Sequence, residues 1–183
     1  MAKEPVAGRV KTRLGQDIGM TNAAWWFRHQ TRRLIRRLRD PRWDLVLAVS
    51  PDVAARESRV WPLDIPRMPQ GAGDIGQRMR NCLSSRLGPA VLIGADIPGV
   101  TPAHIAQAFR TLGANDTVIG PAKDGGFWLV GLKNPQRAPK SLFGNTRWSH
   151  PQTLADALPS LTGRVALLDQ LSDVDTADDL QGS

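Results

Sequence analysis

The sequence predicts an α/β fold, a three-layer α/β/α sandwich around a mostly parallel sheet. Short apolar runs alternate along the chain with amphipathic helical patterns. The run at 90–94 has no polar alternation, as expected for a strand that is buried on both faces. The length of 183 residues, with 41% hydrophobic and 22% charged residues, predicts one globular domain over 1–183.

Each element is predicted by its own local pattern. The expected strands are 44–49, 90–94, 117–119, 127–132 and 165–168. The expected helices are 21–39, 73–87, 102–112, one capped by Ser149 and Gln152 that ends near Leu158, and a short one that begins at Thr176. Thr21 is a good capping residue, and Pro102 follows Thr101 at a first helical position. Ser149 and Gln152 have the spacing of a capping box.

The basic charge of the chain is local. The formal net charge is +7, and the segment 28–42 carries +6 of it, from seven arginines and Asp40. Such a face could bind nucleic acid or acidic lipid. We favour the solvated back of an amphipathic helix, because no aromatic or glycine pattern of a nucleic-acid module accompanies it. No nucleic-acid partner is therefore expected.

The rest of the composition predicts a cytoplasmic protein. Cys82 is the only cysteine, which excludes an internal disulfide, and we expect it to be a small buried residue of a helix. No apolar run approaches the roughly 20 residues of a membrane span. The first residues lead into glycine and arginine rather than into the apolar core of a signal peptide. We expect no membrane partner.

A basic loop opens the chain at 3–14. Gly8 would allow the backbone to approach a ligand, and Lys3, Lys11 and Arg13 supply cations. In an extended loop Lys11 and Arg13 would point the same way, an arrangement that suits a di- or triphosphate. The spacing is not that of a Walker A loop. The alternative is a basic, frayed terminus.

Two carboxylates follow predicted strands. Asp96 stands in a Gly-Ala-Asp-Ile-Pro-Gly loop after the buried strand, where it could hold Mg²⁺ or Mn²⁺ on nucleotide phosphates. Asp124 precedes two glycines, and it could be a second metal ligand or a hydrogen-bond partner of the acceptor. The alternatives are a plain cap for Asp96 and a simple hairpin turn at Asp124.

Two further motifs are less specific. Gly71, Gly73 and Asp74 precede a helix, where free backbone N–H groups can meet a ligand. Asp175 lies in an Asp-Val-Asp-Thr segment, and an acidic helix start stabilises the helix dipole whatever the function. A structural and a functional interpretation of that segment are evenly matched.

The motifs together resemble a bacterial family of small proteins like glycosyltransferases of the A type (GT-A). The motifs are A-K-x-P-x-x-G-x-V-K-T-R-L, Q-G-x-G-D-I-G-x-R, G-A-D-I-P-G, G-P-A-x-D-G-G-F-W-L-V-G-L and D-V-D-T-x-x-D-L, in that order. The family was long a domain of unknown function, and its members are often named glycosyltransferases of arsenosugar biosynthesis or radical-SAM-associated transferases. More distantly, the chain is similar to molybdenum-cofactor and lactyl-phosphate guanylyltransferases.

The resemblance implies a nucleotide-diphospho-sugar transferase fold with Mg²⁺ or Mn²⁺ as cofactor. Lys3, Lys11 and Arg13 would meet the phosphates, Asp96 would bind the metal, and Asp124 would lie opposite it. The sequence departs from the family's pattern in two places. Only one acid occupies the place of an Asp-x-Asp motif, and Met1 stands where the family's first strand should be ending. A truncated first strand is therefore expected.

These observations predict a metal-dependent transferase that uses a nucleotide or nucleotide-sugar donor. Lys11 would stabilise the leaving diphosphate, and Asp124, or with less support Asp175, would be the acceptor base. One alternative is a nucleotidyltransferase that releases pyrophosphate, since the same loop and metal serve both reactions. Another is a non-catalytic binding protein that uses the arginine-rich helix. The sequence names neither the acceptor nor the oligomeric state.

Overall fold

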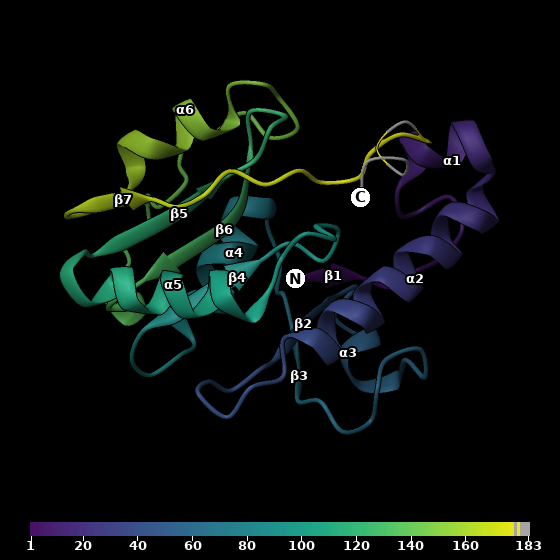
Figure 1. Cartoon of the computed structure of the whole chain (residues 1–183), viewed down its shortest axis with the longest axis horizontal. Helices are drawn as coiled ribbons and strands as arrows, with labels where there is room; N and C mark the ends of the chain where they lie inside the picture. The colour runs from purple at the N-terminus through teal and green to yellow at the C-terminus, as the bar shows by residue number, and fades with distance from the viewer. Residues whose placement is uncertain (178, 180–183) are drawn as a thin grey trace. The chain divides into compact units, whose positions relative to one another are not determined.

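The computed structural model describes residues 1–177 and 179, and they form two compact units (Figure 1). The first unit comprises 1–70, 94–102 and the described residues from Asp173 onward. The second unit comprises 71–93 and 103–172. Each unit has its own sheet, and a single domain over 1–183 stays a prediction.

The sheet of the first unit is parallel throughout. It has the order β1-β2-β3 and consists of β1 (Ala2–Lys3), β2 (Leu47–Ser50) and β3 (Arg67–Pro69). The buried amide of Gln70 donates hydrogen bonds of 3.0 Å to the carbonyls of Ala2 and Ala48, which ties the strands together. The first strand has only two residues, of which Ala2 pairs with Val49 of β2.

Three helices belong to the first unit. They are α1 (Thr12–Ile18), α2 (Met20–Arg37) and α3 (Ala54–Glu57). The prediction of one extended loop over 3–14 was wrong, because the chain turns into α1 directly after Lys11, whose φ of 45° is left-handed. Leu14 of α1 is fully buried, so the segment has an apolar anchor that an exposed loop lacks. Gly19, with φ 90°, separates α1 from α2, so Thr21 is not the cap.

The arginine-rich face of α2 makes several contacts within the first unit. Arg32 donates to the carbonyl of Val60 at 2.9 Å, and Arg39, which follows the helix, pairs with Asp64 at 2.7 Å. Arg42, after the helix, pairs with Asp40 at 2.7 Å. The opposite face of α2 buries Ala24, Phe27 and Ile35 in the core of this unit. The predicted amphipathic helix is present, but its basic face does more than meet solvent.

The sheet of the second unit is mixed. It has the order β4-β6-β5-β7 and consists of β4 (Ala90–Ile93), β5 (Thr117–Pro121), β6 (Phe127–Leu132) and β7 (Val165–Leu167). β6 is antiparallel to both β4 and β5, whereas β5 and β7 are parallel. The reason is the turn at 122–126, which joins β5 to β6 as a hairpin. The predicted α/β class with parallel-rich sheets is confirmed, and the reversed β6 is its exception.

The helices α4 (Ile75–Ser84), α5 (Pro102–Ala114) and α6 (Thr153–Ala157) follow the predicted pattern except at one cap. Two short 3₁₀ helices, Pro135–Arg137 and Leu158–Ser160, lie in the loops. The capping box of Ser149 and Gln152 was wrong, because Gln152 is itself the cap and makes no side-chain cap hydrogen bond. Cys82 is buried in α4, as predicted. Among the helices of the described residues, none has both the length and the apolar character that membrane crossing requires.

Two glycines of the second unit give a matched test of its packing. A Cβ on Gly131 of β6 would lie 2.7 Å from a methyl of Val118, so we expect Gly131→Ala to lower the free energy of unfolding by about 1–3 kcal/mol. A Cβ on Gly113 of α5 would meet nothing within 4 Å, so Gly113→Ala should raise it by about 0.5–1 kcal/mol. Urea unfolding of both variants measures the difference, and equal effects would contradict this packing.

Candidate functional site

Three carboxylates gather in the first unit. Asp96, Asp173 and Asp175 each offer one oxygen, and these oxygens all lie within 4.8 Å of one another. Asp96 comes from the segment 94–102, and the other two come from the end of the chain. The three side chains are partly buried. Oxygen ligands at this spacing suit a hard divalent cation such as Mg²⁺ or Mn²⁺.

Lys11 joins two of these carboxylates. Its Nζ lies 2.7 Å from Asp96 Oδ2 and 2.6 Å from Asp175 Oδ1, and its side chain is only 7% exposed. Burial by itself lowers the pKa of Lys11, but attraction to Asp96 and then to Asp175 outweighs it, so this pKa lies above its ordinary value. Arg13 adds a longer contact of 3.4 Å to Asp175 from a 68% exposed side chain. Lys11 and Arg13, two of the three predicted phosphate-binding cations, therefore already have carboxylate partners.

The end of the chain brings two acids to the cluster. Val174 is 1% exposed, and its N–H donates to the carbonyl of Asp96 at 3.4 Å. Side chains two residues apart in an extended segment face the same side, so a buried Val174 turns Asp173 and Asp175 together toward the cluster. Asp173 was missing from the predicted site. The alternation of acid, apolar residue and acid is the sequence signal that could have found it.

Hydrogen bonds hold the end of the chain in place. Asp179 Oδ2 accepts from the N–H groups of Asp175 and Thr176 at 3.0 and 2.8 Å, and these bonds lower the pKa of Asp179. The Thr176 hydroxyl also donates to Asp179 Oδ2, and the N–H of Ala177 donates to Asp17 of α1. Most of the helix predicted after Thr176 lies outside the described residues.

The other predicted site residues are dispersed. Lys3 is exposed on β1, and Gly8 is exposed with a φ of 75° and open space beside it. Gly71, Gly73, Asp74 and Asp124 belong to the second unit. The metal pair of Asp96 and Asp124 therefore stays a prediction, as does the nucleotide-binding role of the glycines.

Asp74 and Asp124, the two predicted site acids of the second unit, each make a local hydrogen bond. Asp74 and Gln77 form a capping box at α4, with bonds of 2.8 and 3.0 Å between each side chain and the other's N–H. Asp124 is exposed, and its Oδ1 accepts from the N–H of Gly126 at 2.9 Å, which stabilises the hairpin turn. The bond at Asp124 supports the alternative of a hairpin turn there, and the catalytic role of Asp124 stays a prediction.

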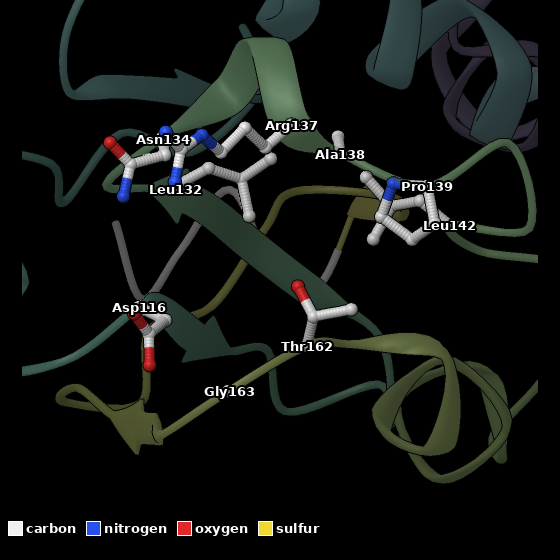
Figure 2. Close-up of a pocket in the computed structure, with 9 residues that line it drawn as sticks. All are labelled: Asp116, Leu132, Asn134, Arg137, Ala138, Pro139, Leu142, Thr162 and Gly163. Carbon is white, nitrogen blue, oxygen red and sulfur yellow. The ribbon is translucent and has the colours of Figure 1, made fainter.

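The second unit also contains a cavity of about 280 Å³ (Figure 2). Figure 2 shows Asn134 and Arg137 on one side of it and Asp116 and Thr162 on the other. Asp116 directly precedes β5, whereas Asp124 follows β5. The cavity therefore lies near the beginning of β5, whereas the Asp124 turn lies at its other end. The cavity contains none of the predicted site residues.

Comparison with known proteins places the chain in a family. Residues 34–150 match the model of a family described as an uncharacterized protein conserved in bacteria, DUF2064. The chain belongs to this family. Of the residues gathered around Lys11, the match includes Asp96. The predicted resemblance to a bacterial family formerly without known function is confirmed.

Solved structures confirm the fold. A protein from Desulfovibrio desulfuricans G20, described as a candidate nucleotide-diphospho-sugar transferase, matches with a TM-score of 0.80 and 28% identity over 96% of this chain and 80% of its own. A 4-diphosphocytidyl-2C-methyl-D-erythritol synthase from Anaerococcus prevotii matches at 0.58 and 11% identity, over 85% of this chain and 83% of its own. A Mycobacterium tuberculosis protein crystallised with manganese matches at 0.50 and 20% identity, over 85% and 84%. The last two likenesses concern the fold alone.

A curated relative points to the same enzyme class. The chain is 29% identical over 83 residues to 2-phospho-L-lactate guanylyltransferase from Methanosarcina acetivorans. That match spans 45% of this chain and 39% of the relative's length. The named relatives agree with the predicted transferase class.

Lys11 makes the stability of the metal-free protein depend on pH in a defined way. A lysine whose pKa is raised on folding stabilises the fold below its ordinary value of 10.5, and this contribution is lost as the pH rises through the folded pKa. We expect Lys11→Met to lower the free energy of unfolding by about 1–3 kcal/mol at pH 8. The difference from wild type should shrink above pH 10.5.

Urea unfolding in EDTA at pH 8 and pH 11 tests this expectation. The chain has no tyrosine, so no phenol titrates in the same range. Lys140→Met removes an exposed lysine of the second unit and should change stability little at either pH. A Lys11→Met deficit that stays constant with pH would show that the Lys11 ion pairs do not cause it.

Proposed function

We propose that this protein is a metal-dependent transferase whose donor is a nucleotide sugar. The single observation that carries the proposal is the meeting of Asp96, Asp173 and Asp175 with Lys11 in the first unit. The similarity to a candidate nucleotide-diphospho-sugar transferase over 96% of the chain supports it. A single functional domain over 1–183 and a cytoplasmic location are part of the proposal.

The donor set of the cluster fits Mg²⁺ or Mn²⁺. Asp96, Asp173 and Asp175 would hold the ion through carboxylate oxygens. A divalent ion there supplies neutralising charge to the diphosphate that leaves the donor. The predicted pair of Asp96 and Asp124 remains an alternative ligand set.

The cations beside the cluster would stabilise the phosphates. The ammonium of Lys11 lies against Asp96 and Asp175, so it would present a positive charge in a partly buried position beside the cluster. Such charges, held in place before the reaction, lower the barrier without reorganising. The exposed guanidinium of Arg13 has one long contact to Asp175, so it can turn toward a phosphate at little cost.

The remaining predicted residues would complete the site. Lys3 and Gly8 would extend the phosphate-binding segment, and Gly71, Gly73 and Asp74 would approach the nucleotide. Asp124 would be the acceptor base, because its side chain is exposed. Asp175 is the second choice for this role, because it already pairs with Lys11.

A nucleotidyltransferase is the second candidate. The similarity to a guanylyltransferase over 83 residues favours it, and the same cations and carboxylates would serve it. A nucleotide-sugar transferase releases a nucleoside diphosphate, whereas a nucleotidyltransferase releases pyrophosphate. The identity of the released product therefore separates the two candidates.

A thermal-shift panel of nucleotides and nucleotide sugars, with and without Mn²⁺, tests the shared part of the proposal. A donor at about 100 times its Kd should stabilise the wild type by about 2.7 kcal/mol. We expect Asp96→Asn and Asp175→Asn to lose the Mn²⁺-dependent stabilisation, because each removes one carboxylate of the cluster. Asp64→Asn changes an exposed carboxylate paired with Arg39 and should keep it.

The same panel can refute the proposal. If no nucleotide or nucleotide sugar shifts the melting temperature of the wild type with Mn²⁺, the donor is not of this class. If the shift survives in both cluster variants, Asp96 and Asp175 do not form the metal site.

A further inference from the structure

The loop that carries Asp96 depends on one arginine of α2. Arg37, the last residue of that helix, donates from Nη1 to the carbonyls of Pro98 and Val100, the second at 3.1 Å. Arg37 is partly buried, and both carbonyls belong to the first unit, as Arg37 does. Hydrogen bonds from a charged guanidinium are about twice as strong as those between neutral groups.

The loop has weak support of its own. The N–H of Val100 donates to the carbonyl of Ile97 at 3.4 Å, a long bond, and Pro98 has no N–H to donate. Val100 is fully buried and Pro98 is half-buried, whereas Gly99 between them is exposed. A carbonyl that is shielded from water needs a hydrogen-bond donor. Arg37 supplies it for the carbonyls of Pro98 and Val100.

A shift of this loop would move Asp96. The Asp96 carbonyl accepts from the N–H of Val174, and its carboxylate contacts Lys11. The spacing of the Asp96 oxygen from those of Asp173 and Asp175 therefore depends on where the loop lies. Arg32 of the same helix donates to the carbonyl of Val60, and Arg39, just after the helix, pairs with Asp64.

We propose that Arg37 is a positioning residue of the metal site, which holds the Asp96 carboxylate at the right distance from Asp173 and Asp175. The proposal rests on the proposed function, because it assumes that these carboxylates bind a divalent ion. Groups that orient metal ligands in this way commonly account for a 10- to 100-fold change in metal affinity. Arg37 makes no contact with the carboxylates among the interactions given above, so it would act through the backbone of the loop.

The test is Mn²⁺ binding to the full chain, measured by isothermal titration calorimetry well below the melting temperature. We expect Arg37→Met, which keeps a long side chain without donors, to raise the Kd for Mn²⁺ about tenfold or more. Arg37→Lys keeps the charge but not the planar fork, so its Kd should be intermediate. Arg36→Met removes an exposed arginine next to it and should leave the Kd unchanged.

A second readout separates positioning from general destabilisation. In Arg37→Met the number of Mn²⁺ ions bound per chain in the calorimeter should stay at its wild-type value while the Kd rises. A merely structural loss would lower that number, because part of the protein would be unfolded and unable to bind. Should Arg37→Met fail to fold, Arg37→Gln, which offers one short amide donor, replaces it under the same criteria.

The outcomes distinguish this inference from the proposed function. If the wild type binds Mn²⁺ and Arg37→Met binds it with the same Kd, the inference about Arg37 is overturned and the metal site stands. If the wild type binds no Mn²⁺, the metal site fails and the role of Arg37 fails with it. A higher Kd in Arg37→Met with an unchanged Kd in Arg36→Met supports the inference.

Discussion

The ammonium of Lys11, held between Asp96 and Asp175, is the interaction on which the first unit depends. Moving a charged group out of water is costly, and the cost is offset only when partners of opposite charge lie within hydrogen-bond distance. Lys11 meets this condition with two contacts of 2.6 and 2.7 Å. Lys11, Asp96 and Asp175 come from three segments that are far apart in the sequence, so these contacts form only when the segments come together.

Local structure around each of the three segments serves this meeting. Lys11 takes a left-handed backbone conformation, which costs a non-glycine residue of the order of 1 kcal/mol, so that α1 can begin directly after it. Leu14 then buries its side chain and fixes the first turns of that helix. Val174 does the same for the end of the chain, since its burial turns both neighbouring acids toward the cluster. Burial of Leu14 and Val174 thus positions these segments, and the ion pairs of Lys11 join them.

The high net charge of the chain acquires a structural explanation. A basic face on an amphipathic helix suggests a polyanion as its partner, yet Arg32, Arg37 and Arg39 bind groups of their own unit. Arg32 and Arg37 donate to backbone carbonyls, so they supply hydrogen bonds that these loops need. Arg33 and Arg36 are exposed on the same helix. The guanidinium group suits this use because it stays charged and offers several N–H donors at the end of a long side chain.

The second unit shows where local rules suffice and where they fail. Its strands and helices lie close to their predicted ranges, because each has a clear apolar pattern and a recognisable start. The cap at Ser149 was wrong, because the Thr153 hydroxyl bonds the carbonyls of Arg147 and His150 and so ties this turn down in place of a capping box. The antiparallel β6 departs from the mostly parallel sheet that was predicted, and it agrees with the alternative of a hairpin turn at Asp124. Strand direction depends on which strands pair, and that choice is made by the whole sheet.

The sequence by itself determined the fold class, most of the elements and the chemical character of the site. Asp96, Lys11 and Arg13 stood out because an acid after an apolar strand suits a divalent cation and cations in a loop with glycine suit phosphate. Only the tertiary structure decided which acid meets which cation. It added Asp173, which meets Asp96 of a distant segment, and it assigned Arg37 to the Asp96 loop across 61 residues. The physical reason is that helical and strand periods act over a few residues, whereas ion pairing and the satisfaction of buried carbonyls act across space.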